Sequence, residues 1–373
     1  MKIICIAGAR PNFMKIAPLM SAFKKQSKIQ PMLVHTGQHY DEKMSNLFFR
    51  QLEIPEPDMN LGCGGGSHAQ QTAAIMTSFE PVVLEHQPDA VLVVGDVNST
   101  IACGMVAVKL GIKLIHVEAG LRSGDRSMPE EINRVLTDSI SDLLFCTEQA
   151  GVDNLRREGI AEEKIHLVGN VMIDTLLRNR EKAARATVLE DLSLTPFGYA
   201  VVTLHRPANV DDPQALAGLV DVLDAVQSDM PTIFPIHPRT YQHLSANGLK
   251  ARVDGMANLR LMEPIGYLEF LKLMANARIV LTDSGGIQEE AAGLGVPTLV
   301  LRETTERPEG VTAGTLRLVG TDTQRIIAET TRLLDDPAAH AAMAHAVNPY
   351  GDGHAAERIA DLLAGVAPTG GNA

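Results

Sequence analysis

Acidic side chains follow two apolar runs in the first half of the chain. Asp96 comes directly after the run 91–95, and Glu118 comes directly after the run 113–117. If both runs are parallel strands, these carboxylates lie at the edge of a sheet where ligands bind, and a charge there is costly unless it is paired or used. Each residue also has a structural alternative, because Asp96 can cap the next helix and Arg122 can form an ion pair with Glu118.

A third acidic site opens a predicted helix at 129–140, which begins with a proline suited to a first helical turn. Glu130 precedes Arg134 by four residues, which favours an ion pair on the helix surface. Glu131 points about 100° away from Glu130, so only one of the two can easily face a site, and the spacing leaves open which. Three carboxylates gathered near strand ends raise at least one pKa, an arrangement that suits general acid–base catalysis.

Two cations stand near the turn that follows the first apolar run, 2–7. Gly8 is expected to permit a tight turn into a helix, so that Arg10 and Lys15 lie near the N-terminus of that helix. The helix dipole disfavours positive charge there unless an anion neutralises it. The sequence therefore predicts diphosphate contacts, with a pair of solvated surface cations as the alternative.

The second half of the chain has a histidine at the corresponding place. His205 follows the run 198–204, as Arg10 follows the first run, and is itself followed by Arg206. A single histidine beside a strand is usually a core residue. This position favours a place in the binding site instead.

A glycine-rich turn is the sharpest local signal. Ser284, Gly285 and Gly286 join the run 278–282 to a predicted helix at 285–294. Two glycines let backbone amides approach an anion closely, and the helix dipole adds attraction. The turn therefore predicts a diphosphate cradle, with a plain glycine turn and a capping serine as the alternative.

Charged residues beyond this turn complete the predicted nucleotide site. Glu289 or Glu290, one turn into the helix, is placed to accept hydrogen bonds from ribose hydroxyls. The polar loop 302–310 follows another apolar run. Arg307 is its predicted anion contact, and the other charges of the loop are expected to be mostly solvated.

Short apolar runs alternate with amphipathic stretches along the chain, which predicts right-handed β-α-β units and an α/β fold with doubly wound parallel sheets. Twelve strands are predicted, at 2–7, 31–36, 90–95, 113–117, 143–147, 165–168, 198–204, 231–236, 258–261, 278–282, 297–301 and 315–319. Predicted helices include 69–85, 97–110, 129–140, 148–158, 213–227, 267–276 and 285–294. A charged stretch at 178–192 separates two series of six strands. We therefore expect two Rossmann-like domains, 1–180 and 190–350, facing a central cleft.

Composition limits the classes of function. The chain of 373 residues is long enough for two domains, and its net charge of −12 argues against a nucleic-acid groove. No stretch approaches the ~20 apolar residues of a membrane span. The four cysteines are widely spaced and lack the spacing of a metal site. We expect a cytoplasmic protein that binds neither nucleic acid nor membrane.

Taken in order, these motifs resemble the non-hydrolysing UDP-N-acetylglucosamine 2-epimerase family over nearly the whole chain. The matching motifs are Gly8-Ala9-Arg10-Pro11, Val94-Gly95-Asp96, His116-Val117-Glu118-Ala119-Gly120-Leu121-Arg122, Pro129-Glu130-Glu131-Ile132-Asn133-Arg134, Leu204-His205-Arg206, Asp283-Ser284-Gly285-Gly286-Ile287-Gln288-Glu289-Glu290 and Thr304-Thr305-Glu306-Arg307-Pro308. The resemblance implies a glycosyltransferase B-type fold. It also implies a C-terminal helix near 354–365 that returns to the first domain, and a homodimer.

The resemblance also implies a reaction. UDP is eliminated across carbons 1 and 2 of UDP-N-acetylglucosamine, and 2-acetamidoglucal and UDP remain bound. UDP adds again after carbon 2 is reprotonated on the opposite face, which gives UDP-N-acetylmannosamine. No metal or redox cofactor is implied.

Residue roles follow from the same likeness. Asp96, Glu118 and Glu130 are implied to be the acid–base and charge-stabilising carboxylates, and His205 to lie near the diphosphate or the sugar. The implied ligand contacts are Arg10, Ser284, Gly285, Gly286 and Arg307 for the phosphates, Lys15 for the anionic side of the cleft, Glu290 for the ribose and Phe270 beside the uracil.

Other functions fit parts of this pattern. A hydrolysing relative, which releases N-acetylmannosamine and UDP, and a glycosyltransferase on the same scaffold share most of the contacts. The glycosyltransferase differs because it needs an acceptor. A catalytically silent nucleotide-sugar sensor is the alternative outside the enzymes, and the three carboxylates speak against it.

Overall fold

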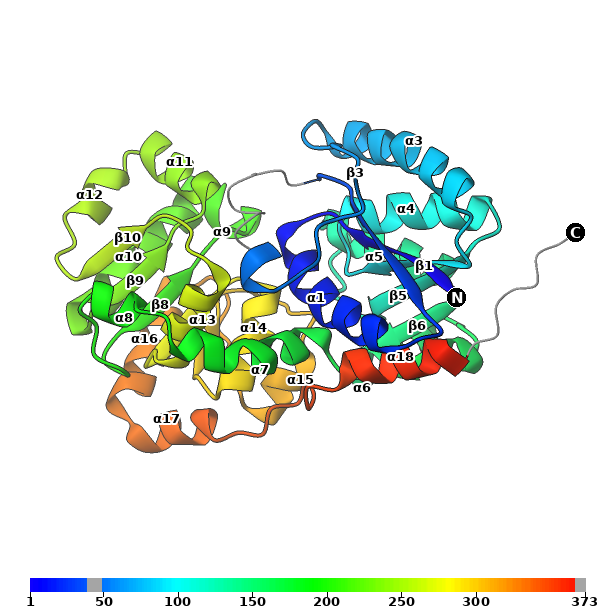
Figure 1. The fold of residues 1–373 in the computed structure, drawn as a ribbon. Coiled ribbons are helices and arrows are strands. Elements are labelled where there is room, and N and C mark those ends of the chain that lie inside the picture. Colours follow the sequence, from blue (N-terminus) through cyan, green and yellow to red (C-terminus); the bar gives the residue numbers. More distant parts are fainter. Residues whose placement is uncertain (39–48, 366–373) are drawn as a thin grey trace, which may run out of the picture. The chain divides into compact units, whose positions relative to one another are not determined.

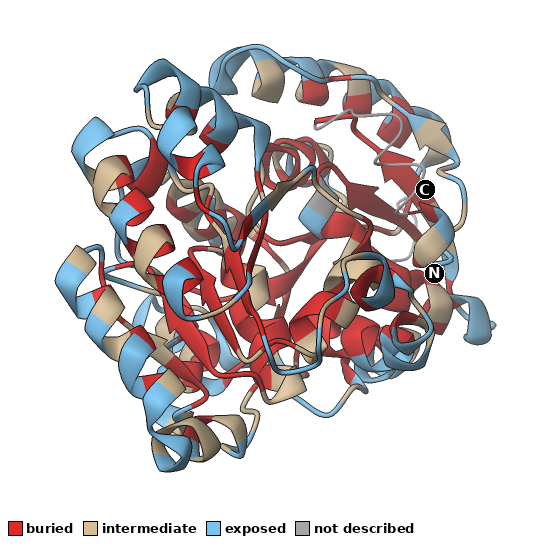
Figure 2. Ribbon diagram, turned by 90° about the vertical axis from the view of Figure 1, so that its left-hand side faces the viewer, coloured by how far each residue is buried: buried red, intermediate tan, exposed pale blue. Residues whose placement is uncertain are grey.

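The computed structural model describes residues 1–38 and 49–365. The chain falls into two compact units, Met1–Arg178 with the segment from Gly351 onward, and Asn179–Tyr350. Each unit has one parallel sheet with helices packed on its faces (Figure 1). Figure 2 shows that buried residues concentrate in the strands and on the inner faces of the helices.

The first unit holds a seven-stranded sheet in the order β3-β2-β1-β4-β5-β6-β7. Its strands are β1 Lys2–Ala7, β2 Gln30–His35, β3 Met59–Asn60, β4 Ala90–Val94, β5 Lys113–Ala119, β6 Leu143–Cys146 and β7 Ile165–Leu167. All five residues of β4 are buried and apolar, as expected for a central parallel strand covered on both faces.

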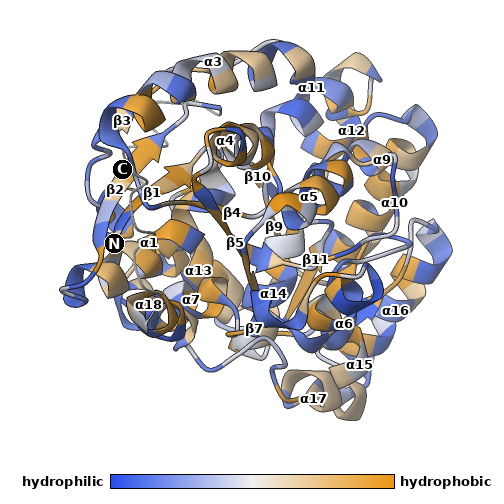
Figure 3. Ribbon diagram, turned by 90° about the vertical axis from the view of Figure 1, so that its right-hand side faces the viewer, coloured by the Kyte–Doolittle hydropathy of each residue, from blue (hydrophilic) through white to orange (hydrophobic). Residues whose placement is uncertain are grey.

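The helices of the first unit follow the strands in alternation. They are α1 Arg10–Lys25, α3 His68–His86, α4 Asn98–Lys109, α5 Pro129–Ile140, α6 Gln149–Arg157, the 3-10 turn Glu162–Lys164, α7 Val171–Ala184, whose residues from Asn179 belong to the second unit, and α18 Ala355–Gly365. Helix α4 packs against both α3 and α5 and is buried over most of its length. Figure 3 accordingly shows α4 as largely hydrophobic.

The C-terminal helix α18 packs beside α1 in the first unit (Figure 1). Asp174 on α7 accepts hydrogen bonds from the N–H groups of Ala355 and Ala356, at 3.1 and 2.7 Å. These bonds satisfy amides that the first turn of a helix leaves without a partner. The side chain of Gln26, at the end of α1, donates to Asp361 at 2.7 Å.

The second unit holds a six-stranded sheet in the order β10-β9-β8-β11-β12-β13. Its strands are β8 Ala200–Thr203, β9 Thr232–Pro235, β10 Leu259–Met262, β11 Ile279–Thr282, β12 Thr298–Val300 and β13 Leu316–Leu318. Its helices are α8 Val188–Asp191, α9 Pro207–Val210, α10 Pro213–Asp229, α11 Pro238–Ala246, α12 Lys250–Asp254, α13 Tyr267–Ala275, α14 Gly285–Leu294, α15 Pro308–Ala313, α16 Thr323–Asp335 and α17 Pro337–Ala344.

Both sheets have a point at which the strand order reverses. In the first unit β1 lies between β2 and β4, and in the second β8 lies between β9 and β11. Ligands of doubly wound sheets bind outside the carboxyl ends of the strands at such a point. The residues that follow these strands are Gly8 and Gly95 in the first unit, and Leu204 and Asp283 in the second.

The predicted fold class is confirmed, and the structure adds two details that the sequence pattern did not show. All twelve predicted strands are present with ends within two residues of those expected, whereas the two-residue strand β3 was missed because it is too short to show a period. The stretch 178–192 is mostly helical, in α7 and α8. Buried residues recur at Leu176, Asn179 and Ala183, but the polar Asn179 interrupts the apolar pattern by which a helix is recognised.

Candidate active site

The turn after β4 positions the carboxylate of Asp96. Gly95 has a φ of +67°, a conformation that glycine adopts at little cost. The side chain of Asp96 is 33% exposed, and its Oδ2 accepts a hydrogen bond from Arg134 Nη2 at 2.7 Å. Asn133 Nδ2 donates to the main-chain carbonyl of Asp96 at 2.9 Å. The N-cap of α4 is Val97, so the alternative that Asp96 caps this helix is wrong.

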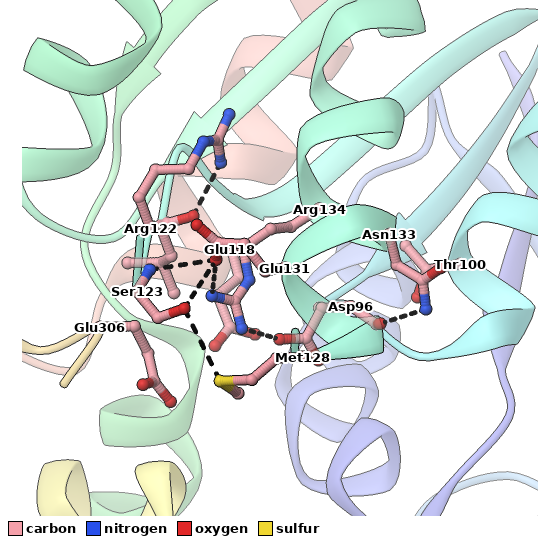
Figure 4. Close-up of polar contacts among 12 residues, drawn as sticks. Asp96, Thr100, Glu118, Arg122, Ser123, Met128, Glu131, Asn133, Arg134 and Glu306 are labelled. Carbon is pink, nitrogen blue, oxygen red and sulfur yellow. Dashed lines mark hydrogen bonds and ion pairs between the residues drawn. The ribbon is translucent and has the colours of Figure 1, made fainter. Parts of the chain in front are cut away.

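Arg134 lies between two carboxylates of the first unit (Figure 4). Besides contacting Asp96, it donates through Nη1 to Glu131 Oε2 at 2.5 Å, and both Arg134 and Glu131 are buried. Glu131 also accepts hydrogen bonds from the N–H and Oγ of Ser123, both at 3.0 Å, and from the N–H of Gly124 at 2.9 Å. Glu131 therefore anchors the loop that precedes α5, and Arg134 compensates its charge.

Glu130 is the second residue of α5 and is half-buried. The salt bridges of Arg134 run to Glu131 and Asp96, so the surface pair between Glu130 and Arg134 suggested by their spacing is wrong. Of the two adjacent glutamates, Glu131 holds the loop. The catalytic role of Glu130 stays a prediction.

Glu118 occupies an unusual backbone position at the end of β5. Its φ is +73°, and the pairing register with β6 shifts between Val117 and Ala119. Only glycine adopts such a φ without strain, so the surrounding contacts must hold Glu118 in place. The carboxylate forms a buried ion pair with Lys15. A Cβ at Gly95 would lie 3.1 Å from Lys15 Nζ and 3.3 Å from Glu118 Oε2, so the pair packs against the turn that carries Asp96.

Arg122 does not take the place that its spacing suggested. Its guanidinium contacts Asp138 Oδ2 at 2.7 Å and both carboxylate oxygens of Glu158, at 2.6 and 2.8 Å. Burial disfavours the charge, but these carboxylates outweigh it and raise the pKa of Arg122. The expected ion pair with Glu118 is wrong, since Lys15 provides that partner.

The turn after β1 is shaped by close packing. The side chain of Asn12 accepts hydrogen bonds from the N–H groups of Gly8 and Ala9, at 3.1 and 2.9 Å. A Cβ at Gly8 would approach the Oγ of Ser99 to 2.2 Å, and φ of Gly8 is not positive. Glycine is needed here because there is no room for a side chain. The conformational freedom expected from the sequence is not the reason. Helix α1 begins at Arg10, whose side chain lies outside the described part of the structure.

His205, after β8, is oriented by an aspartate at the end of β11. Its Nδ1 lies 2.9 Å from Asp283 Oδ1, and Asp283 also accepts from the main-chain N–H groups of His205 and Arg206, at 3.0 and 2.9 Å. Asp283 is fully buried, whereas the side chain of His205 is 40% exposed. Burial alone would raise the pKa of Asp283, but the hydrogen bonds from His205 and Arg206 lower it.

The glycine turn opens helix α14 as predicted. Ser284 is the N-cap residue, and its N–H donates to Thr282 Oγ1 at 3.0 Å. Gly285 packs against the loop after β12, because a Cβ there would lie 2.6 Å from Glu306 Oε1. The first turn of α14 therefore has backbone amides at the switch point of the second sheet.

Arginines gather around Glu306 next to this turn. Glu306 Oε2 lies 2.8 Å from Arg302 Nη2, and Arg206 Nη2 lies 3.7 Å from Glu306 Oε1. Arg307 forms a buried ion pair with Glu289 on α14. Burial would raise the pKa of Glu306, but Arg307 and Arg302 lower it well below its ordinary value of 4.5. The expectation that the other charges of this loop are mostly solvated is wrong for Arg302 and Glu306, which are buried.

The two predicted contacts for the nucleoside lie on neighbouring helices. Glu290 is buried on α14, and Phe270 is partly exposed on α13. The buried hydroxyl of Tyr267, also on α13, is near Glu290, since burial and the Glu290 carboxylate raise the pKa of Tyr267. Of the two alternatives for the ribose, Glu289 is engaged by Arg307.

Several side chains of the candidate site were not singled out by sequence reasoning. Asp283 follows a buried strand as Asp96 does, so the same signal could have indicated it. Arg134 and Glu131 were named only as alternatives, and their contact with Asp96 depends on the approach of α5 to the end of β4. Within residues 1–38 and 49–365, no group of His, Cys, Asp and Glu side chains has the arrangement of a metal site, and no helix is long and apolar enough to cross a bilayer.

Comparisons with known proteins match this arrangement. The family model of UDP-N-acetylglucosamine 2-epimerase matches residues 21–364. The chain is 42% identical to the UDP-N-acetylglucosamine 2-epimerase of Methanocaldococcus jannaschii, over 97% of this chain and 99% of the relative. It is 41% identical to the UDP-2,3-diacetamido-2,3-dideoxy-D-glucuronate 2-epimerase of Pseudomonas aeruginosa, over 98% and 99%. The crystal structure of the M. jannaschii enzyme with UDP-GlcNAc and UDP superposes with a TM-score of 0.90, covering 97% of this chain and 99% of that chain.

The buried charges around Glu306 predict a pH dependence of stability. Because its pKa is lower in the folded than in the unfolded state, Glu306 stabilises the fold above about pH 4.5, and this contribution is lost as the pH falls below that value. We expect Glu306→Gln to reduce the free energy of unfolding at pH 7 by about 3–5 kcal/mol, because it leaves buried arginines uncompensated. Urea unfolding at pH 7, 5 and 4 measures this, and the difference from the unmodified protein should shrink below pH 4.5.

Glu303→Gln is the matched control, because Glu303 lies in the same loop and is exposed. An equal loss of stability in both variants at pH 7 would contradict the assignment.

Proposed function

The chain belongs to the UDP-N-acetylglucosamine 2-epimerase family, and on this premise we propose that it interconverts UDP-N-acetylglucosamine and UDP-N-acetylmannosamine. The observation that carries the proposal is the packing of Glu118, Lys15 and the Gly95–Asp96 turn at the switch point of the first sheet. It supplies closely spaced carboxylates whose charges are compensated by cations, as elimination and re-addition of a proton on carbon 2 require.

In the proposed reaction, the bond between carbon 1 and the diphosphate oxygen breaks, and its electron pair leaves with UDP. The proton on carbon 2 passes to a carboxylate, and a double bond forms between carbons 1 and 2. The developing positive charge is stabilised by the remaining carboxylates. A proton then returns to carbon 2 from the opposite face, and UDP adds again. We assign these roles jointly to Asp96, Glu118 and Glu130.

We assign the diphosphate to the amides of Ser284, Gly285 and Gly286 and to Arg307. The helix terminus and the neighbouring cluster of arginines support this assignment, because both favour negative charge. Arg10 is proposed as a further phosphate contact.

The remaining assignments concern the sugar and the nucleoside. His205, whose ring is fixed through Nδ1 by Asp283, is assigned to the diphosphate or the sugar. Glu290 is assigned to the ribose and Phe270 to the uracil. Lys15 is assigned to the anionic side of the site, where it compensates Glu118.

A second substrate is a real alternative. The chain is 41% identical to a 2-epimerase of a UDP-diacetamido-glucuronate and 42% identical to one of UDP-N-acetylglucosamine. The two sugars differ at carbons 3 and 6, whereas the chemistry at carbon 2 is shared. The described carboxylates therefore serve either substrate.

We propose in addition that the protein acts in the cytoplasm, because all four cysteines are buried free thiols.

The reaction is tested by NMR on UDP-N-acetylglucosamine in deuterated buffer. We expect UDP-N-acetylmannosamine to appear and solvent deuterium to enter carbon 2 in both epimers, because the proton is exchanged in each cycle. The diacetamido-glucuronate analogue is tested in parallel. Free N-acetylmannosamine as the product would overturn the proposal in favour of hydrolysis, and an absence of deuterium at carbon 2 would exclude an epimerase.

The role of the carboxylates is tested by substitution. We expect Asp96→Asn and Glu130→Gln to lower kcat by at least about 100-fold, because a positioned acid or base contributes roughly 10²–10⁴-fold. UDP binding, measured by calorimetry, should change little. Glu131→Gln is the informative comparison, since it removes the anchor of the loop before α5 and should lower the unfolding free energy. Near-normal rates in both Asp96→Asn and Glu130→Gln would refute the assigned roles.

We also propose that the protein forms a homodimer through α3, α4 and α5. These helices pack side by side and expose three large apolar side chains, Leu84, Val108 and Leu136. We expect Leu136→Glu to change the mass in light scattering from that of two chains to that of one, because a charge would be buried at the interface. Leu362→Glu, at a similarly exposed leucine on α18, is the control and should leave the mass unchanged. A monomeric unmodified protein would refute this proposal.

A further inference from the structure

Two fully buried side chains, His116 on β5 and Asp138 on α5, form a pair behind the proposed catalytic carboxylates. His116 Nδ1 lies 2.6 Å from Asp138 Oδ1, and His116 Nε2 lies 2.8 Å from the carbonyl oxygen of Gly95. A carbonyl oxygen only accepts hydrogen bonds, so Nε2–H donates a hydrogen bond to the main-chain carbonyl of Gly95. The imidazole is thus fixed through both of its nitrogen atoms.

Asp138 joins this histidine to a second stretch of backbone. Its Oδ2 accepts hydrogen bonds from the N–H of Gly120, at 3.0 Å, and from Arg122 at 2.7 Å. The Asp138 side chain thus contacts the imidazole through Oδ1 and contacts an amide and a guanidinium through Oδ2. The two side chains therefore link the carbonyl of Gly95 to the amide of Gly120.

These two backbone positions flank the proposed catalytic carboxylates. Gly95 directly precedes Asp96, and Gly120 follows Glu118 by two residues. Asp138 lies on the same helix as Glu130, about two turns further along. The buried pair thus lies on two of the elements that carry the carboxylates, β5 and α5, and contacts the turn after β4 that carries the third.

The backbone at these points needs support from its surroundings. Gly95, Glu118 and Gly120 all have positive φ, at +67°, +73° and +82°. Such conformations persist in non-glycine residues only where neighbouring contacts determine them. The hydrogen bonds of His116 and Asp138 reach two of these three residues, Gly95 and Gly120.

We infer that His116 and Asp138 are positioning residues that hold Asp96, Glu118 and Glu130 in the geometry required for proton transfer at carbon 2. This inference rests on the proposed function. Both side chains have no exposed surface, so they act through the carboxylates that they place.

The experiment uses His116→Asn, His116→Gln and Asp138→Asn. We expect His116→Asn and Asp138→Asn to lower kcat by about 10–100-fold, because a displacement of about 1 Å at reacting groups costs rates of this order. The Kd of UDP should stay within twofold. His116→Gln should retain more activity than His116→Asn, since its longer side chain can still donate to the carbonyl of Gly95.

A purely structural role predicts a different result. Loss of folded protein lowers every rate equally, so the ratio of deuterium entry at carbon 2 to epimer formation stays constant. Misplaced carboxylates change this ratio and release 2-acetamidoglucal and UDP. Asp142→Asn is the matched control, because Asp142 accepts from the N–H of Leu114 at 2.9 Å, at the amino end of the same strand.

The inference is overturned if His116→Asn and Asp138→Asn match Asp142→Asn in kcat and in this ratio, per mole of folded protein. If one variant does not fold, the other two decide. Failure of the proposed function is recognised separately, because the unmodified protein would then neither exchange nor epimerise carbon 2.

Discussion

The first unit depends on one constraint: it must hold several carboxylates close together where they are partly or fully buried. Asp96, Glu118 and Glu131 belong to three different elements, and burial makes each uncompensated carboxylate costly. Lys15 compensates Glu118, and Arg134 is shared between Asp96 and Glu131. The cations come from α1 and α5. These helices must therefore pack on the sheet where their cations reach the carboxylates.

The second unit meets the opposite constraint. Arg206, Arg302 and Arg307 lie around Glu306 beside the turn that opens α14, and Glu306 compensates part of this positive charge. Gly285 belongs to the same arrangement, because any larger residue would displace Glu306. A cluster of cations next to the amides of a helix N-terminus favours negative charge, which supports the proposed place of the diphosphate.

Backbone geometry connects the charges to the chemistry. Asp96 follows β4 where the first sheet reverses its order, Glu118 lies near the end of the neighbouring strand β5, and Glu130 lies in the first turn of α5. The positive φ of Glu118 is the clearest cost, since an ordinary residue occupies a conformation suited to glycine. Buried contacts from β5 and α5 hold this segment, which connects its stability to the placement of the carboxylates.

The sequence by itself determined every strand but β3, several of the helices and the positions of the motifs, because alternating apolar runs and glycine turns are local properties of the chain. It also indicated Asp96, Glu118, His205 and the Ser284 turn as residues that follow strands. Only the tertiary structure decided the partners: Lys15 and not Arg122 for Glu118, Arg134 for Asp96 and Glu131, and Asp283 for His205. The physical reason is that these contacts join residues far apart in the chain, and strand order and helix packing, which spacing does not encode, bring them together.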